Sequence, residues 1–144
     1  MTQEKIFSAY GIVNHMRKYS HTPAASYKLF KLNRTLKPVF DFQTEQRKKL
    51  LEKYPPKKFD GVNFEFNDAE TATAFKQEWD ELTNLESEIE IKPIQISLAD
   101  LNNEMPLYPD DYEVLDGIIE FTEEDKNDDI KVEMLPVEAA ADEE

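Results

Sequence analysis

The sequence predicts a mainly α-helical fold with a minor β component, arranged as one domain. In four segments, apolar residues recur at steps of three and four, which places them on one face of a helix. Two short segments are extended in character and rich in isoleucine or phenylalanine, as half-buried strands are. The chain has 144 residues, enough for one ordinary domain and too few for two.

The first helix is expected over residues 3–19. Thr2 can cap its start. The run Ser20-His21-Thr22-Pro23 then breaks the pattern, and Thr22 followed by Pro23 indicates the N-cap and first residue of a second helix. The apolar face of the first helix consists of Ile6, Ala9, Tyr10, Val13 and Met16.

The second helix, expected over residues 23–54, has the strongest pattern. Its apolar seam resembles that of a coiled coil, which suggests dimerisation or swapping through this helix, although Gln43 and Gln46 weaken it. Pro38 predicts either a kink near Arg34 or two separate helices. We favour one kinked helix, because the seam keeps its phase through the proline. The seam consists of Ala25, Leu29, Leu32, Leu36, Val39, Gln43, Gln46, Leu50 and Tyr54.

The rest of the chain predicts two strands and two further helices. Residues 62–66 and 88–96 are expected to pair as a two-stranded antiparallel ribbon, with a parallel pair as the other option. A third helix is expected over 68–85, capped by Asn67 or Asp68, and a C-terminal helix over 109–120. The predicted architecture is therefore an antiparallel helical hairpin with a long kinked helix, a third helix, a ribbon and a C-terminal helix.

Charge is divided unevenly along the chain, whose net charge is -14. Residues 104–144 carry 16 acids and two bases, residues 17–58 carry 12 bases and three acids, and residues 59–103 carry 11 acids and two bases. Either the basic segment lies beside acidic segments of the same chain, or it meets an acidic partner or nucleic acid. We do not expect nucleic acid, because the acidic end would compete for the same bases.

The acidic end also sets the predicted domain boundary. Residues 1–121 are expected to form the single helical domain, and residues 122–144 an acidic tail that is disordered or loosely docked. No apolar stretch is long enough to span a membrane, and the start MTQEKIF lacks the apolar core of a signal peptide.

No pattern in the sequence predicts catalysis. The chain has no cysteine, and its three glycines are isolated, so a thiolate site or a phosphate-binding loop is excluded. His15 and His21 are six residues apart with a break between them, and the acidic clusters lack the glycine of a calcium loop. We therefore expect no enzyme activity, no catalytic residues, no metal and no cofactor.

The aromatic content points instead to protein contacts. Phenylalanines of the second helix lie near lysines and Arg34, and aromatic rings beside arginine are typical of binding hot spots. The alternatives are that the rings stack on single-stranded nucleic acid or that they wedge between helices as core. The candidate interface comprises Leu29, Phe30, Leu32, Arg34, Leu36, Phe40, Phe42 and Trp79.

The order of these features resembles a family of small tailed-bacteriophage proteins that is classed as a domain of unknown function. The resemblance covers roughly residues 5–121. It rests on the opening SYKLFKL and the closing QRKKLLEKY of the long helix, the extended stretch 88–94 followed by ISLADL, and the last helix 112–119. Pro38 and the apolar patch of the tail depart from the family's pattern, so the long helix is not expected to be straight. The resemblance implies a phage origin and carries no catalytic signature.

Two functions are compatible with these features. The first is a non-enzymatic phage structural or assembly protein that contacts phage or host proteins and can form a homo-oligomer. The second is a phage-encoded acidic inhibitor that binds a host nucleic-acid-binding or defence protein. Both place the chain in the bacterial host cytoplasm or the phage particle, and a carboxylate metal enzyme is the weakest alternative.

Overall fold

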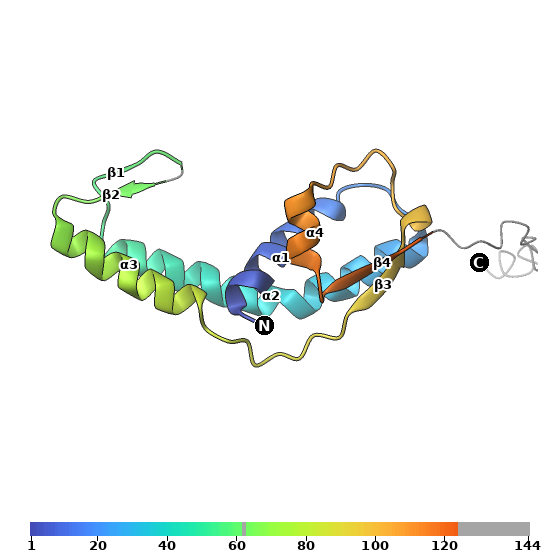
Figure 1. Ribbon diagram of the computed structural model, residues 1–144, viewed down its shortest axis with the longest axis horizontal. Helices are drawn as coiled ribbons and strands as arrows, with labels where there is room; N and C mark the ends of the chain where they lie inside the picture. Colours follow the sequence, from blue (N-terminus) through green and yellow to red (C-terminus); the bar gives the residue numbers. More distant parts are fainter. Residues whose placement is uncertain (62, 124–144) are drawn as a thin grey trace, which may run out of the picture.

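The computed structural model describes residues 1–61 and 63–123, and it confirms a mainly helical fold with a minor β component. The molecule is elongated, because the long helix α2 runs through most of its length (Figure 1). The elements are α1 (Gln3–Met16), α2 (Pro23–Lys53), β1 (Lys58–Phe59), β2 (Phe64–Glu65), α3 (Ala69–Thr83), β3 (Ile94–Ser97), the 3-10 helix η1 (Leu98–Asp100), α4 (Pro109–Leu115) and β4 (Ile119–Thr122).

Side-chain caps begin the first three helices where the sequence predicts them. The hydroxyl of Thr2 accepts a hydrogen bond from the backbone N–H of Lys5, and the hydroxyl of Thr22 accepts one from Ala25. The carboxylate of Asp68 accepts one from Thr71. Each cap satisfies a backbone donor that the first helical turn leaves without a partner.

Helix α2 remains one helix of 31 residues through Pro38, as the unbroken seam predicted. Proline removes one hydrogen bond from the helix interior, and here its ring lies on the exposed side. The buried residues of α2 keep the predicted seam phase on both sides of Pro38. They are Ala25, Leu29, Leu32, Asn33, Leu36, Val39 and Gln43.

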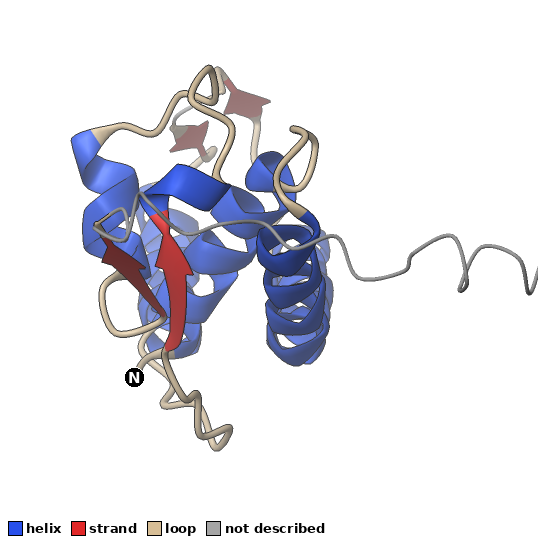
Figure 2. Cartoon of the chain, turned by 90° about the vertical axis from the view of Figure 1, so that its right-hand side faces the viewer, coloured by secondary structure: helices blue, strands red, loops and turns tan. Residues whose placement is uncertain are grey.

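The seam of α2 packs inside the chain, mainly against the antiparallel helix α1. The short strands β3 and β4 and the helix α4 close the same core. The β3–β4 pair lies at the end of the molecule that faces the viewer in Figure 2, and the β1–β2 pair lies behind. The other members of this core are Ile6, Ala9, Val13, Met16, Ile96, Leu115, Ile118 and Ile119. The seam residues from Ala25 to Gln43 are therefore buried within one chain, and dimerisation through this helix stays a prediction.

The predicted ribbon between residues 62–66 and 88–96 is wrong. Strand β2 pairs instead with β1, in an antiparallel hairpin with Phe59 opposite Phe64. The turn closes locally, because Asn63 donates its backbone N–H to the carboxylate of Asp60 and Gly61 adopts a φ of 97°. Strand β3 pairs in parallel with β4, in the register from Ile94–Ile119 to Ser97–Thr122.

The predicted C-terminal helix over 109–120 is also too long. Helix α4 ends at Leu115, and Gly117 then turns the chain with a φ of 84°. The next residues, Ile118 and Ile119, are buried and lead into β4. A glycine near the end of a helical pattern often follows the C-cap, and Gly117 was the available signal here.

The molecule has a body and an arm. The body contains α1, the first half of α2, α4 and the β3–β4 pair, whereas the arm consists of the second half of α2, α3 and the β1–β2 hairpin (Figure 1). The predicted tail began at residue 122, but Thr122 belongs to β4, and residues 124–144 lie outside the described residues.

Candidate functional site

A group of aromatic and basic side chains covers the outward face of α2 near its start. We call it the aromatic–basic face, and it consists of Arg17, Tyr27, Phe30, Lys31 and Arg34. The rings of Tyr27 and Phe30 are stacked with centroids 6.4 Å apart, yet they remain 61% and 41% exposed. The four α2 residues share one face because the other three lie three, four and seven positions after Tyr27.

Cations flank both exposed rings. The guanidinium carbons of Arg17 and Arg34 lie 5.8 and 5.6 Å from the centroid of the Phe30 ring. The ammonium of Lys31 lies 5.4 Å from the centroid of the Tyr27 ring. Cation–π contacts at exposed sites contribute about 0.5–1 kcal/mol each. They therefore favour an arrangement in which rings and charges are held together before any partner binds.

The electrostatic environment of this face is basic. Residues 17–40 contain six bases and no acid. In the described part of the chain, no carboxylate forms an ion pair with Arg17, Lys31 or Arg34. The face can therefore attract an acidic surface without first breaking an ion pair.

The second half of the basic segment is different. Arg47 pairs with Glu4, Lys49 with Glu45, and Lys53 with Glu78. The basic segment was expected either to lie beside acids of the same chain or to meet an acidic partner, and each interpretation fits one half of it. Acids of the same chain neutralise bases toward the end of α2, whereas the bases near its start face solvent.

Three of the predicted interface residues are not at the surface. Leu29 and Leu36 are fully buried, and Leu32 is 4% exposed. These leucines lie on the seam that α1 covers, so assigning them to an interface with a partner was wrong for the folded monomer. Phe30 and Arg34, which flank the seam, are exposed and belong to the aromatic–basic face.

The other two phenylalanines of α2 have separate surroundings. Phe40 is half-buried and stacks on Phe7 and Tyr10 of α1, with centroids 4.8 and 4.3 Å away. Phe42 is 44% exposed but lies 12 residues beyond Phe30, about 18 Å along the helix. Phe40 thus follows the core interpretation, and Phe42 is an isolated exposed ring.

Trp79, the last predicted interface residue, belongs to an aromatic cluster in the arm. Its ring lies 5.2 Å from that of Phe75, which also contacts Phe64 and Phe66. Phe59 stacks on Phe64 at 4.5 Å and stays 55% exposed. The cluster fills the space between α3 and the β1–β2 hairpin, so these rings serve mainly as the core of the arm.

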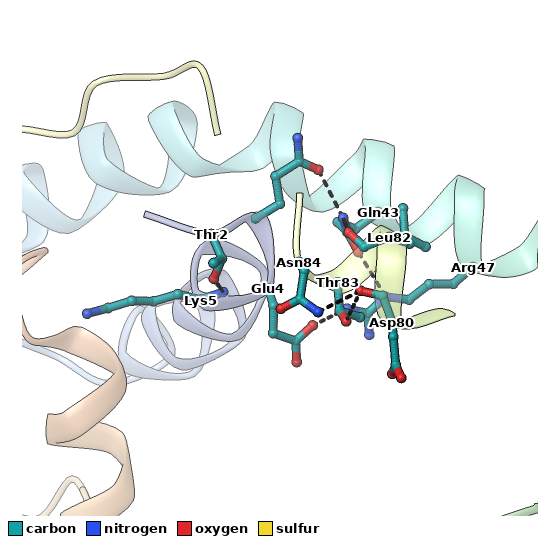
Figure 3. Close-up of polar contacts among 10 residues, drawn as sticks. Thr2, Glu4, Lys5, Gln43, Arg47, Asp80, Leu82, Thr83 and Asn84 are labelled. Atoms are coloured by element: carbon teal, nitrogen blue, oxygen red, sulfur yellow. Dashed lines mark hydrogen bonds and ion pairs between the residues drawn. The ribbon is translucent and has the colours of Figure 1, made fainter. Parts of the chain in front are cut away.

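A buried amide joins the body to the arm. The amide nitrogen of Gln43 donates to the side-chain oxygen of Gln3 at 2.9 Å and to the backbone carbonyl of Leu82 at 3.0 Å. Its oxygen accepts a hydrogen bond from Arg47 Nε at 3.2 Å, so one fully buried side chain connects α1, α2 and α3 (Figure 3). Gln43, which weakened the predicted seam, is therefore a hydrogen-bonded contact between three helices.

Arg47 extends this network. Its guanidinium pairs with Glu4 and lies between two rings, 3.9 Å from the centroid of Phe7 and 5.1 Å from that of Trp79. A planar guanidinium can stack on rings while it pairs with a carboxylate, which a lysine cannot do equally well. This network was missed because its members are far apart in the sequence.

Another ion pair holds the tip of the arm. Tyr54 donates its hydroxyl hydrogen to the carboxylate of Glu78, and the ammonium of Lys53 lies 3.0 Å from the same group. These two donors, Tyr54 before Lys53, hold the pKa of Glu78 below its usual value. The arm therefore depends in part on a charged Glu78.

The two histidines have structural surroundings. His21 Nδ1 accepts a hydrogen bond from the backbone N–H of Asn102, so Nε2 carries the proton and donates to the carbonyl of Met16 at 2.7 Å. His15 packs edge-on against Tyr19. His21 thus ties the connection between α1 and α2 to the chain that leads to α4.

Among the described residues, no group of three or more His, Cys, Asp or Glu side chains could hold a metal ion. Within the same residues, no helix combines the length and the apolar character needed to cross a membrane. Comparisons with protein-family models, curated proteins and solved structures gave no match to this chain.

Proposed function

We propose that this chain is a non-enzymatic protein that acts in the structure or assembly of a phage particle by binding an acidic surface of a protein partner. The observation that carries the proposal is the aromatic–basic face, where two exposed rings stand among three cations that have no carboxylate partner in the described part of the chain. Aromatic and arginine side chains contribute most of the binding energy in many protein interfaces.

The fold supports a binding role for this face. The body behind it is a closely packed helical hairpin, so Tyr27, Phe30 and Arg34 are presented from a regular helix and not from a loop. Interface side chains that are already ordered lose less conformational entropy on binding. The assignment to a phage particle rests on the resemblance to the tailed-bacteriophage family.

The test measures binding of the purified chain to purified particles of the phage that encodes it. In a sedimentation titration with the particles, we expect Phe30→Ser and Arg34→Glu each to raise the dissociation constant at least tenfold, as loss of a hot spot worth about 1.4 kcal/mol or more implies. Phe42→Ser and Lys48→Glu make the same chemical changes at exposed positions of α2 outside the face, and should bind like the wild type. Equal binding by all four variants would refute the assignment of the face.

A second candidate, an acidic inhibitor of a host nucleic-acid-binding or defence protein, is favoured by the opposite charge at the end of the chain. Residues 104–123 contain seven acids and no base, and exposed members of this group include Asp110, Glu113, Asp116 and Glu120. Such a surface could imitate the charge of DNA for a basic protein.

The second candidate has to be tested without deleting the acidic end, because part of that end belongs to the core. Removing residues 104–144 would also remove Leu115, Ile118 and Ile119 from the core. The informative variant is Asp110→Asn combined with Glu113→Gln, Asp116→Asn and Glu120→Gln in the full chain. Loss of salt-sensitive binding to a basic host protein in this variant, with binding to particles unchanged, would favour the inhibitor over the assembly protein.

A further inference from the structure

The described chain ends close to the start of α2. Thr122, at the end of β4, pairs with Ser97 of β3, and η1 follows directly. The carbonyl of Asp100 in η1 accepts a hydrogen bond from the backbone N–H of Thr22, the N-cap of α2. Phe30 lies eight residues beyond Thr22, about 12 Å along the helix.

The sequence beyond the described part is complementary in charge to the aromatic–basic face. We call residues 124–144 the acidic segment; it has nine acids and two bases, a net charge of -7. At most about 3.3 Å per residue, its 21 residues can reach some 70 Å, so distance does not limit it to one surface. Its apolar residues are Ile130, Val132, Met134, Leu135 and Val137.

From these features we propose that the acidic segment of the chain docks on its own aromatic–basic face. Carboxylates of the segment would pair with Arg17, Lys31 and Arg34, and its apolar side chains would cover the rings of Tyr27 and Phe30. Farther along α2, the bases Arg47, Lys49 and Lys53 are poorer targets, because they already pair with carboxylates.

The charges near the end of β4, where the acidic segment begins, also favour docking on the aromatic–basic face. Exposed acids lie on α4 and β4, among them Glu113, Asp116 and Glu120, and like charges there disfavour docking of the acidic segment on these elements. A tethered segment also acts at an effective concentration in the millimolar range, so even a weak contact is populated. The segment then occupies the face that the proposed function assigns to a partner, and an acidic partner has to displace it.

A spin-label measurement on the full chain tests this proposal without any partner. The chain contains no cysteine, so Ala139→Cys provides a single site for a nitroxide label in the acidic segment. In the ¹⁵N-labelled full chain, we expect the label to reduce the amide signals of Tyr27–Arg34 strongly and to leave those of the distant helix α3 unchanged. Raising the salt to about 1 M shortens the Debye length to roughly 3 Å and should restore the signals.

Matched variants identify the face. Lys31→Glu combined with Arg34→Glu should abolish the loss of signal. Lys48→Glu combined with Lys49→Glu makes the same change in charge at exposed positions farther along α2 and should retain it. An amide spectrum with native peak positions for α1 shows that each variant remains folded.

Two results would overturn the proposal. The first is the absence of any signal loss at Tyr27–Arg34. The second is an equal loss when a spin-labelled chain without ¹⁵N is mixed with an unlabelled ¹⁵N chain, because the segment would then come from a second copy. Neither result affects the proposed function, since the binding of particles by Phe30→Ser and Phe42→Ser is measured separately.

Discussion

Gln43 shows how one polar side chain can specify the arrangement of three helices. It is fully buried, and each polar atom of its amide has a partner, on α1, α2 or the end of α3. Buried polar groups are tolerated when they are hydrogen-bonded and costly when they are not. The seam of α2 therefore changes character at Gln43, where the body ends and the arm begins.

Replacing Gln43 should destabilise the protein. In Gln43→Leu, the carbonyl of Leu82 and the Nε of Arg47 lose their buried partner, and we expect the free energy of unfolding to fall by about 1–3 kcal/mol. Gln46→Leu, one turn along at a half-exposed position, should be close to neutral. Urea unfolding followed by circular dichroism measures both, and equal midpoints for the two variants would contradict the role given to Gln43.

Gly117 and Gly11 have different roles, because Gly117 lies in the turn after a helix and Gly11 lies inside one. Gly117 has a φ of 84° between α4 and β4, whereas Gly11 lies inside α1 with nothing within 4 Å of an added Cβ. Alanine at position 117 costs about 1–2 kcal/mol, because a side chain disfavours the left-handed region. Alanine at position 11 should gain about 0.5–1 kcal/mol of helix propensity. Thermal unfolding should therefore move in opposite directions for the two variants, and a rise in Tm for Gly117→Ala would contradict the turn.

The arm should respond to acid through Glu78. Hydrogen bonds from Tyr54 and Lys53 lower the pKa of Glu78 in the folded state. A lowered pKa contributes stability above the unfolded value of about 4.3, and this contribution is lost as the pH falls through the folded value. In Glu78→Gln, the difference in stability between pH 7 and pH 3 should be smaller than in the wild type, as measured by urea unfolding at each pH. A difference of the same size would show that this carboxylate does not contribute.

The helices were largely predictable from the sequence, and the strands were not. Steps of three and four, with caps at Thr2, Thr22 and Asp68, placed α1, α2 and α3 to within a few residues. The strands contain two or four residues each, and tertiary contacts select their partners. Phe64 pairs within a local hairpin because Gly61 allows the turn, and Ile94 pairs with Ile119 because Gly117 ends α4.

The candidate site was predictable only in part. Position on the helix distinguishes Phe30 and Arg34 from Leu29 and Leu32, but the sequence alone did not say that α1 would cover the seam. Arg17 comes from a different element and joins the face only through the α1–α2 connection. The contacts of Gln43 with Gln3 and Leu82 span about 40 residues of sequence, which no local pattern reports.

The division into body and arm predicts uneven stability across the molecule. Helix α1 buries four residues in the main core, whereas α3 buries only Phe75 and Leu82. Regions with few buried apolar contacts open with smaller free energies. In native-state hydrogen exchange, amides in the middle of α3 should exchange at least tenfold faster than those in the middle of α1. Equal exchange rates would show that body and arm unfold as one unit.

The charge pattern of the whole chain also has a functional consequence. Ion pairs neutralise three bases near the end of α2, whereas the three bases of the aromatic–basic face pair with no carboxylate in the described part of the chain. Rigid presentation of Phe30 and Arg34 there is the basis for proposing a partner with an acidic surface.

Photo-crosslinking in infected cells addresses this assignment directly. A benzoylphenylalanine in place of Phe30 reports on the aromatic–basic face, and the same residue in place of Phe42 reports on an equally exposed position outside it. We predict crosslinks to a phage structural protein from position 30 and few from position 42. Equal crosslinking from both positions, or crosslinks from position 30 only to a basic host protein, would contradict the proposed assembly role.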